Sequence, residues 1–378
     1  MNNKKIFMCV NYPKYNKAIG ISKKIQMQIE AFEKLGYTVV YSAYSENGIE
    51  IYRNQEKIYS KNFHINKISN FIRRFYLLKT CIEYLKVNQF DLAFVRWDAV
   101  DRLFLCALAY LKKSCNNVLM DFHGYFPNYN VPGIKGIYTK EMTRLNGNKM
   151  KNYVDYGITE TKNKTLFGIP TLPIDTGIDV KRYKRHQYCG STNILNMISV
   201  ANETVYHGYD RVLRGLSEYI TKYPSEKVYI HLVGKISDKT IKLIHVLKLE
   251  KYVCLYGYLS GDKLYDVYNQ CNVGIGPLAP HRMGGKEGTG IKTKEYFAIG
   301  LPYFYAGQEL MVPDDYPYVM KIGADDSPVC IMEIIKFYNQ IKEDKNMQEN
   351  MRSFARENFS WETIFKNSIE VMGLESGE

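Results

Sequence analysis

One stretch of this chain, residues 281–302, concentrates glycines, cations and two glutamates directly before an apolar segment. Its glycines let a backbone approach a ligand closely, and they are Gly284, Gly285, Gly288 and Gly290. The apolar pattern that follows predicts a helix that begins near Ile291, with Thr289 or Thr293 as its cap. The stretch therefore constrains the fold to one in which a glycine-rich loop opens a helix beside a ligand.

The N-terminus of such a helix attracts anions, because its first amides lack partners and the helix dipole is positive there. Four cations strengthen this field: Arg282, Lys286, Lys292 and Lys294. A diphosphate fits this environment, and Glu287 and Glu295 would then accept hydrogen bonds from a sugar and from ribose hydroxyls. The alternative is an ordinary capped helix with solvated charges. Composition alone favours the nucleotide-sugar pocket only modestly.

Glu287 and Glu295 enclose seven residues and precede the segment 296–302, Tyr-Phe-Ala-Ile-Gly-Leu-Pro. This element resembles the E-x7-E motif of the retaining GT-B glycosyltransferases of family 4 (glycosyl transferases group 1). Further matches extend the resemblance over most of the second half of the chain, at residues 206–211, 228–234 and 255–265. The resemblance implies an α/β GT-B fold with two Rossmann-like domains facing each other across a cleft. It also implies that Glu287 meets the donor sugar and Glu295 the ribose.

Carried onto this chain, the resemblance implies a donor site made of Gly20, Arg211, Gly257, Thr289, Gly290, Ile291, Lys292 and Glu295. The implied catalytic residues are His123 and Glu287. His123 follows a predicted strand at 118–122, and family members carry a histidine facing the donor sugar at the corresponding strand end. A lone histidine at a strand end is commonly structural, and turn capping alone can explain Asp121.

The chain departs from the family at one point. Family members place an arginine and then a Lys-Gly pair after the strand predicted at 194–200, whereas this chain has Asn202 and His207-Gly208. Two strong cations are missing, so other donors must stabilise the charge on the leaving nucleotide. The candidates are Arg211, Lys292 and Lys294. A similar His-Gly pair before an arginine occurs in bacterial capsule and exopolysaccharide enzymes, so we expect a rearranged site.

No two aspartates have the Asp-x-Asp spacing with which metal-dependent glycosyltransferases bind a divalent cation. We therefore expect no metal and no cofactor, with a nucleoside-diphosphate sugar, of UDP or GDP, as the donor substrate. In this family the leaving phosphate helps to deprotonate the acceptor hydroxyl, so the resemblance implies retention of the anomeric configuration. The eight cysteines form no CxxC pair and indicate neither a disulfide framework nor a zinc site.

The length of 378 residues exceeds what one hydrophobic core usually organises, which predicts two domains. Apolar runs alternate with amphipathic segments, and this pattern predicts parallel sheets wrapped by helices. A βαβ opening is expected from a strand at 5–12, a helix that is capped by Ser22 and continues through Leu35, and a strand at 36–42. The expected division is an acceptor-binding domain at 1–185, a nucleotide-sugar domain at 190–358, and a helix at 359–378 that crosses back to the first domain.

Positive charge is concentrated in the first half of the chain. Residues 1–185 carry 30 Lys and Arg against 15 Asp and Glu, whereas residues 186–378 carry 21 against 24. This asymmetry indicates an anionic partner, either a bilayer surface or nucleic acid. Residues 65–85 predict a helix with one apolar face, made of Ile68, Phe71, Ile72, Phe75 and Leu78, beside Lys67, Arg73, Arg74 and Lys79. The helix either lies in a membrane interface or packs on its own sheet.

These observations predict a retaining, metal-independent hexosyltransferase that moves a sugar to a glycan or lipid-linked oligosaccharide acceptor in cell-surface polysaccharide synthesis. The apolar run at 6–10 is too short for a signal peptide. We therefore expect a cytoplasmic enzyme that is peripheral on the inner face of the membrane, with an anionic membrane surface and no nucleic acid among its partners. Two other functions stay open: a GT-B nucleotide-sugar epimerase or soluble sugar-phosphate transferase, and a non-enzymatic nucleic-acid-binding protein.

Overall fold

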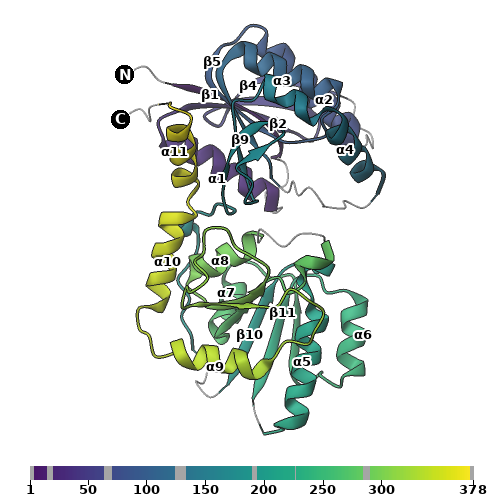
Figure 1. Cartoon of the computed structure of the whole chain (residues 1–378), viewed down its shortest axis with the longest axis vertical. Helices are drawn as coiled ribbons and strands as arrows, with labels where there is room; N and C mark the ends of the chain where they lie inside the picture. The colour runs from purple at the N-terminus through teal and green to yellow at the C-terminus, as the bar shows by residue number, and fades with distance from the viewer. Residues whose placement is uncertain are drawn as a thin grey trace. The chain divides into compact units, whose positions relative to one another are not determined.

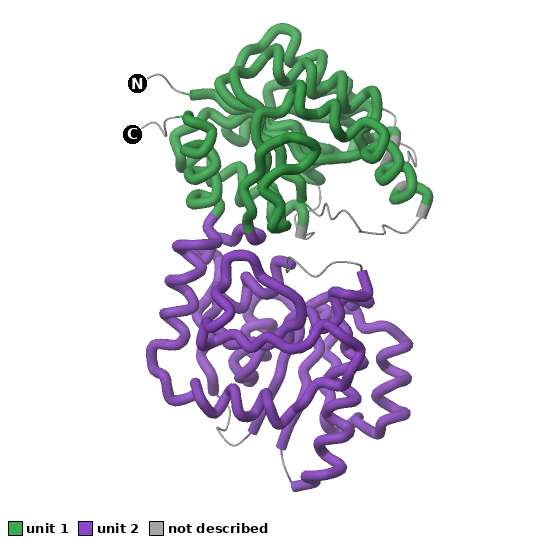
Figure 2. The backbone as a smooth tube through the Cα atoms, in the orientation of Figure 1, with its two compact units in different colours: residues 1–174, 361–378 green, residues 175–360 purple. Residues whose placement is uncertain are grey.

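The structure is a computed structural model of the whole chain. It describes residues 4–14, 20–63, 70–123, 133–189, 194–225, 227–283 and 290–374. The chain divides into two compact units: residues 1–174 with 361–378 form unit 1, and residues 175–360 form unit 2 (Figure 2). Each unit has its own sheet flanked by helices (Figure 1). Two α/β units, each built on a largely parallel sheet, confirm the expected fold class.

Unit 1 contains a nine-stranded sheet in the order β4-β3-β2-β1-β5-β6-β7-β9-β8. Its strands are β1 Lys5–Pro13, β2 Thr38–Tyr44, β3 Gly48–Arg53, β4 Glu56–Asn62, β5 Phe90–Arg96, β6 Cys115–Asp121, β7 Tyr156–Thr159, β8 Thr165–Leu166 and β9 Ile169–Pro173. The six strands from β2 through β1, β5, β6 and β7 to β9 are parallel, whereas β3, β4 and β8 join antiparallel at the two edges. The chain reverses its direction across the sheet between β1 and β5, which is where α/β sheets bind ligands.

The helices of unit 1 are α1 Gly20–Lys34, α2 Asn70–Leu85, α3 Arg102–Ser114, α4 Gly133–Asn146, the 3-10 segment η1 Gly147–Asn152, and α11 Trp361–Val371. The predicted βαβ opening is present as β1, α1 and β2. Ser22 does not cap α1 but lies inside it, because the helix already begins at Gly20. The Ser22 hydroxyl instead donates to the Pro13 carbonyl at 3.1 Å, which ties α1 to the end of β1.

The C-terminal helix α11 belongs to unit 1. The ring of Phe365 stacks on Phe32 of α1 with 3.9 Å between centroids, and it meets Phe94 of β5 edge-on. All three side chains are almost fully buried, so α11 completes the apolar core on this side of the sheet. None of the described helices has the length and apolarity that a membrane span requires.

Unit 2 contains a six-stranded parallel sheet in the order β12-β11-β10-β13-β14-β15. Its strands are β10 Leu195–Val200, β11 Val228–Val233, β12 Val253–Gly257, β13 Val273–Ile275, β14 Tyr303–Ala306 and β15 Val319–Ile322. Its helical segments are η2 Val180–Arg182, η3 Val205–His207, α5 Tyr209–Lys222, α6 Asp238–Val246, α7 Asp262–Gln270, η4 Pro280–Met283, α8 Ile291–Ile299, α9 Ile331–Ile341 and α10 Met347–Asn358. The strand order reverses between β10 and β13, and this is the switch point of the sheet.

The segment after Ile174 is part of unit 2, although the sequence suggested that the first domain continues to residue 185. Its contacts explain the difference. The backbone N–H of Ile178 donates to the carbonyl of Phe359 at 2.7 Å, and His186 Nε2 lies 2.9 Å from the carbonyl of Cys271. These hydrogen bonds between distant segments hold residues 175–189 within unit 2.

Candidate functional site

The N-terminus of α8 lies against the end of β10 at the switch point of unit 2. Lys292, in the first turn of α8, reaches Ser199 on β10 with 3.1 Å between Nζ and Oγ. The helix begins at Ile291 as predicted, and its N-cap is the exposed Gly290, which makes no side-chain capping bond. The Thr293 hydroxyl donates instead to the Gly290 carbonyl at 3.3 Å, so Thr293 does not cap the helix. The first amides of α8 therefore suit an anionic ligand.

Lys292 is buried, with 7% of its surface exposed. None of the ion pairs formed among the described residues includes it. Burial lowers its pKa to about 7, and the carboxylate of Glu295 acts weakly in the opposite direction. A buried ammonium group is unfavourable without an opposite charge. An anion bound at this helix end would supply that charge.

His207 stands close to Lys292, at a position where the resemblance leads one to expect a lysine. The backbone N–H of Thr204 donates to its Nδ1 at 3.0 Å, which places the proton of the neutral ring on Nε2. Burial first, and then the charge of Lys292, lower the pKa of His207 to about 3. His207 is therefore a neutral hydrogen-bond donor and does not replace the missing cation.

Gly208 explains why the loop can lie so close to the neighbouring segment. Its φ is +60°, and a Cβ added there would come within 2.8 Å of the Cβ of Ala279. The loop is held by backbone hydrogen bonds from Leu278 to His207 and from Ala279 to Tyr206. Only glycine combines the positive φ with the missing Cβ that this close approach needs, so the fold requires Gly208 directly after His207.

Lys294 has a different role from the predicted one. Its Nζ lies 3.1 Å from Glu309 and 3.5 Å from Asp175, and all three side chains are buried. The carboxylate of Asp175 also accepts from the backbone N–H of Met311 at 2.8 Å, and Glu309 accepts from Tyr303 at 2.8 Å. Lys294 is thus saturated by protein acceptors, which removes it from the candidates for diphosphate binding. We call Lys294, Asp175 and Glu309 the Lys294 triad.

Arg211 is also engaged by the protein. Its guanidinium donates to the carbonyls of Ser327, at 2.8 Å, and Leu278, and to the carboxylate of Asp325 at 3.1 Å. The side chain is buried, and burial lowers its pKa. Arg211 therefore ties the start of α5 to two loops. Its donors already have acceptors, so a diphosphate would have to compete with them.

The remaining predicted donor residues come from both units. Glu295 is half-buried in α8, and its Oε1 accepts from the Tyr183 hydroxyl at 3.1 Å. Gly257 ends β12 with φ +64° and open space beside its Cα. Ile291 is half-buried as the first residue of α8, and Gly20 is the first residue of α1 in unit 1. Glu287 and Thr289 lie outside the described residues.

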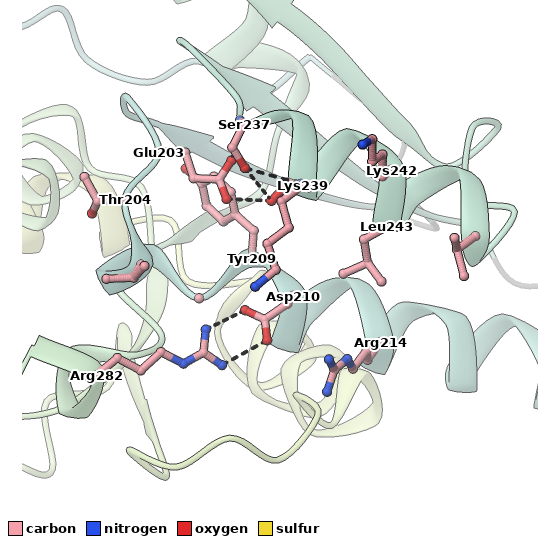
Figure 3. A pocket seen from close by; sticks show the side chains of 14 residues that line it. Glu203, Thr204, Tyr209, Asp210, Arg214, Ser237, Lys239, Lys242, Leu243 and Arg282 are labelled. Carbon is pink, nitrogen blue, oxygen red and sulfur yellow. Dashed lines mark hydrogen bonds and ion pairs between the residues drawn. The ribbon is translucent and has the colours of Figure 1, made fainter.

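A cavity of about 580 Å³ opens beside the same loop of unit 2, between α5 and α6 (Figure 3). Figure 3 shows the guanidinium of Arg282 facing the carboxylate of Asp210, with N–O distances of 2.7 and 2.9 Å. Glu203 accepts from the backbone N–H of Ser237 at 2.7 Å. Of the described donor-site residues, none lines this cavity, although it shares Gly208 with the candidate site.

Unit 1 holds a second group of buried charges at the C-terminal ends of its strands. Asp121 ends β6, and its Oδ2 lies 3.9 Å from Arg96 Nε and 4.0 Å from Lys24 Nζ. Lys24 pairs more closely with Glu160, at 3.1 Å. His123 follows at the same edge, with 24% of its side chain exposed. We call these five residues the Asp121 cluster.

Three members of the Asp121 cluster were not singled out from the sequence. Arg96 is the last residue of β5, Glu160 follows β7, and Lys24 lies in the second turn of α1. The available signal was that strand ends of a parallel sheet gather at one edge. Burial, together with the charges of Arg96 and Lys24, lowers the pKa of His123 well below its ordinary value. His123 is therefore neutral in this cluster.

The chain matches no protein-family model and no curated protein. Among solved structures, it is similar to a glycosyltransferase from Rickettsia africae, with 14% identity, a TM-score of 0.68 and 98% of both chains covered. It is also similar to sucrose-phosphate synthase from Thermosynechococcus elongatus, with 14% identity, a TM-score of 0.67, and 97% and 98% covered. The Anabaena protein HepE in complex with UDP matches with 12% identity, a TM-score of 0.61, and 98% and 99% covered. These likenesses show that the chain has the GT-B fold found in glycosyltransferases.

Proposed function

We propose that this protein is a glycosyltransferase that takes its sugar from a nucleoside diphosphate bound at the N-terminus of α8. The observation that carries the proposal is Lys292, which is buried in the first turn of α8 and has no ion-pair partner among the described residues. Isolated buried charges are rare because they are costly, and they mark sites where a ligand completes the pairing. The shared fold with glycosyltransferases favours a nucleotide sugar as that ligand.

The donor is a nucleoside-diphosphate sugar, and UDP is the first nucleotide to test. The Anabaena neighbour HepE is described in complex with UDP and with UDP-glucose. In this chain, Lys292, the first amides of α8 and the Nε2–H of His207 would stabilise the charge that develops on the leaving diphosphate. Glu295, one turn further along α8, would accept hydrogen bonds from the ribose hydroxyls, as the family resemblance implies. GDP remains the second nucleotide in the proposal.

The finer features of the reaction follow the family 4 resemblance. We infer that the transfer retains the anomeric configuration, needs no metal, and uses Glu287 and His123 at the donor sugar. The acceptor is a glycan or lipid-linked oligosaccharide, and the product serves a bacterial cell-surface polysaccharide. The sequence motif at 287–302 supports these features. Because Asn202 and His207 stand where family members carry cations, Lys292 is the main cation for the diphosphate in this proposal.

A thermal-shift panel tests the donor site, with UDP, GDP, ADP and their sugars as ligands. We expect one nucleotide to stabilise the protein, with a smaller shift in Lys292→Met and in Glu295→Ala and no effect of a chelator. Lys242→Met, which removes an exposed cation of α6, is the matched control and should respond like the wild type. Stabilisation by short oligonucleotides in place of any nucleotide would contradict the proposal. Proton NMR of the transfer product then reports the anomeric configuration.

We further propose that unit 1 contacts an anionic membrane surface. Its residues carry 27 Lys and Arg against 17 Asp and Glu, a net charge of +10, whereas unit 2 carries 24 against 22. On α2, Ile72 and Phe75 are exposed, whereas Leu78 of the predicted apolar face is buried. Arg74 pairs with Asp98 and Asp101, so it stabilises unit 1 and is not counted among the cations that face the membrane. Ile68 and the side chain of Phe71 lie outside the described residues.

Helix α4 adds an exposed apolar face that the sequence did not indicate. Ile134 is 88% exposed, Ile137 63% and Leu145 58%. Tyr138 of α4 and Arg74 of α2 both bind the carboxylate of Asp101, at 2.9 and 2.7 Å, so the two helices lie close together. Apolar side chains on a strongly basic unit fit a bilayer with anionic lipids better than they fit nucleic acid.

Liposome co-sedimentation tests this second proposal. Vesicles that contain phosphatidylglycerol should bind the protein, and vesicles of phosphatidylcholine alone should not. The double variant Phe75→Ser, Ile137→Ser should bind several-fold less, whereas Val87→Ser, at an 83% exposed position after α2, should bind normally. Equal binding by the two variants would show that charge alone, and not this face, brings the protein to the vesicles.

A further inference from the structure

Arg96 makes a contact with His123 that limits where the imidazole can carry its proton. The Nε of Arg96 lies 3.3 Å from Nδ1 of His123. A guanidinium group stays protonated at every pH at which the protein is folded, so its Nε–H can only donate. The Nδ1 of His123 must then be the acceptor, and the proton of the neutral ring must sit on Nε2.

A second contact of Nδ1, to a backbone carbonyl, would be a hydrogen bond only if the proton of the ring were on Nδ1. That carbonyl does not require this proton. Nδ1 of His123 also lies 3.2 Å from the carbonyl oxygen of Asp121, which would accept from an Nδ1–H. That oxygen already accepts from the backbone N–H of Trp97 at 2.9 Å. A proton on Nδ1 would in addition face the Nε–H of Arg96. The arginine contact therefore decides the tautomer.

The surroundings keep Arg96 in place without neutralising it closely. Among the described residues, Arg96 pairs with Oδ2 of Asp121, which is 3.9 Å from Nε. The same oxygen lies 4.0 Å from Lys24 Nζ and accepts from Gln28 at 3.3 Å. The Nη1 of Arg96 is buried and has no hydrogen-bond partner among the described residues. Arg96 is thus a buried cation whose direct hydrogen bond to a side chain is the one to His123.

We propose that Arg96 is a positioning residue that holds His123 in its Nε2–H form, so that His123 donates a hydrogen bond to a hydroxyl of the donor sugar and does not act as a base. The identity of the ligand rests on the proposed function, whereas the tautomer rests on the contacts alone. Among the described residues, Arg96 and Lys24 oppose a charged ring, whereas Glu160 favours one. The carboxylate of Asp121 lies 4.0 Å from Nδ1, and it and Glu160 pair with the two cations.

Nitrogen-15 NMR of the protein with labelled histidine tests the tautomer directly, with His123→Gln to assign the signal. In the wild type we expect one neutral Nε2–H ring from pH 5 to pH 8. In Arg96→Met the ring should populate both tautomers, because the Nε–H that donates to Nδ1 is removed. Lys24→Met, which removes a nearby cation but leaves the Nδ1 contact intact, should keep the Nε2–H form.

The result that overturns the inference is an Nδ1–H signal in the wild type, or an Arg96→Met spectrum identical to that of the wild type. If Arg96→Met does not fold, the wild-type spectrum alone still decides. Activity supplies the second readout: kcat of the wild type should be flat between pH 5 and pH 8, and kcat of Arg96→Met should be lower throughout this range, because only a fraction of its molecules carry the Nε2–H tautomer. If the tautomer is as stated but no nucleotide sugar is turned over, the proposed function fails and the positioning role stands.

Discussion

Lys292 and Lys294 are two residues apart in α8 and both are buried, yet their surroundings are opposite. Lys294 lies between two carboxylates that are themselves bound by backbone amides and a tyrosine. Among the residues that the structure describes, the polar side chain that binds Lys292 is the hydroxyl of Ser199. Two positions along a helix turn a side chain by about 200°, so one lysine faces the interior of unit 2 and the other faces the switch point. The comparison separates a charge that completes the fold from one that is left for a ligand.

The same contrast recurs in unit 1 between two buried arginines. Arg74 binds Asp98 at 2.9 Å and Asp101 at 2.7 Å, and these contacts join α2 to the start of α3. Among the described residues, Arg96 pairs with the carboxylate of Asp121, at 3.9 Å. In both units the incompletely paired cation lies near a strand end at the switch point: Arg96 ends β5, and Lys292 contacts Ser199 near the end of β10. This distribution is the expected one if strand ends are reserved for substrates.

The largest expected effect is on stability. Lys294→Met removes one partner of a buried ion-pair group and leaves Asp175 and Glu309 without a cation, so the free energy of unfolding should fall by about 3–5 kcal/mol. Urea unfolding followed by circular dichroism measures this change. Lys292→Met is the matched control in the same helix, and its stability should be unchanged or higher. Equal losses in the two variants would erase the distinction between the two lysines.

The next effect is on donor binding. Lys292→Met removes a charge-assisted contact to the diphosphate, which is worth about 1.5–3 kcal/mol, so the affinity for the stabilising nucleotide should fall by about 10- to 100-fold. Isothermal titration calorimetry measures the affinity. Lys242→Met should bind normally, because Lys242 is exposed on α6. An unchanged Kd in Lys292→Met would mean that the diphosphate is held elsewhere.

The sequence predicted the elements of both units well, because alternating apolar patterns and helix starts are local. The start of α8 at Ile291 and the strand predicted at 194–200, which the structure has as β10 Leu195–Val200, are examples. It did not predict which lysine of α8 is paired, since the partners of Lys294 come from residues 175 and 309 and are set by tertiary packing. It also missed Arg96 and Lys24, because an isolated cation carries no pattern until the sheet brings strand ends together.

A pH dependence of binding sharpens the comparison further. The pKa of Lys292 in the free protein is lowered to about 7, and a bound diphosphate should raise it. Binding above pH 7 therefore takes up a proton, and the affinity should weaken as pH rises, by at most about tenfold per unit. Below the free-protein pKa the lysine is protonated in both states and the dependence should flatten. Titrations in two buffers of different ionisation enthalpy count the proton, and Lys292→Met corrects for titration of the nucleotide itself.

The smallest expected effect concerns His207, where the family resemblance leads one to expect a lysine. His207→Lys would introduce a cation next to Lys292, whose charge already contributes to lowering the pKa of His207 to about 3. Two neighbouring ammonium groups oppose each other's protonation. A lysine at position 207 would therefore lower the protonated fraction of Lys292, and the total positive charge of the site would rise by much less than one unit. We expect the nucleotide affinity to rise less than about threefold at pH 7. A gain of a hundredfold would show that the two positions hold their charges independently, and that Lys292 has not taken over the role of the missing cation.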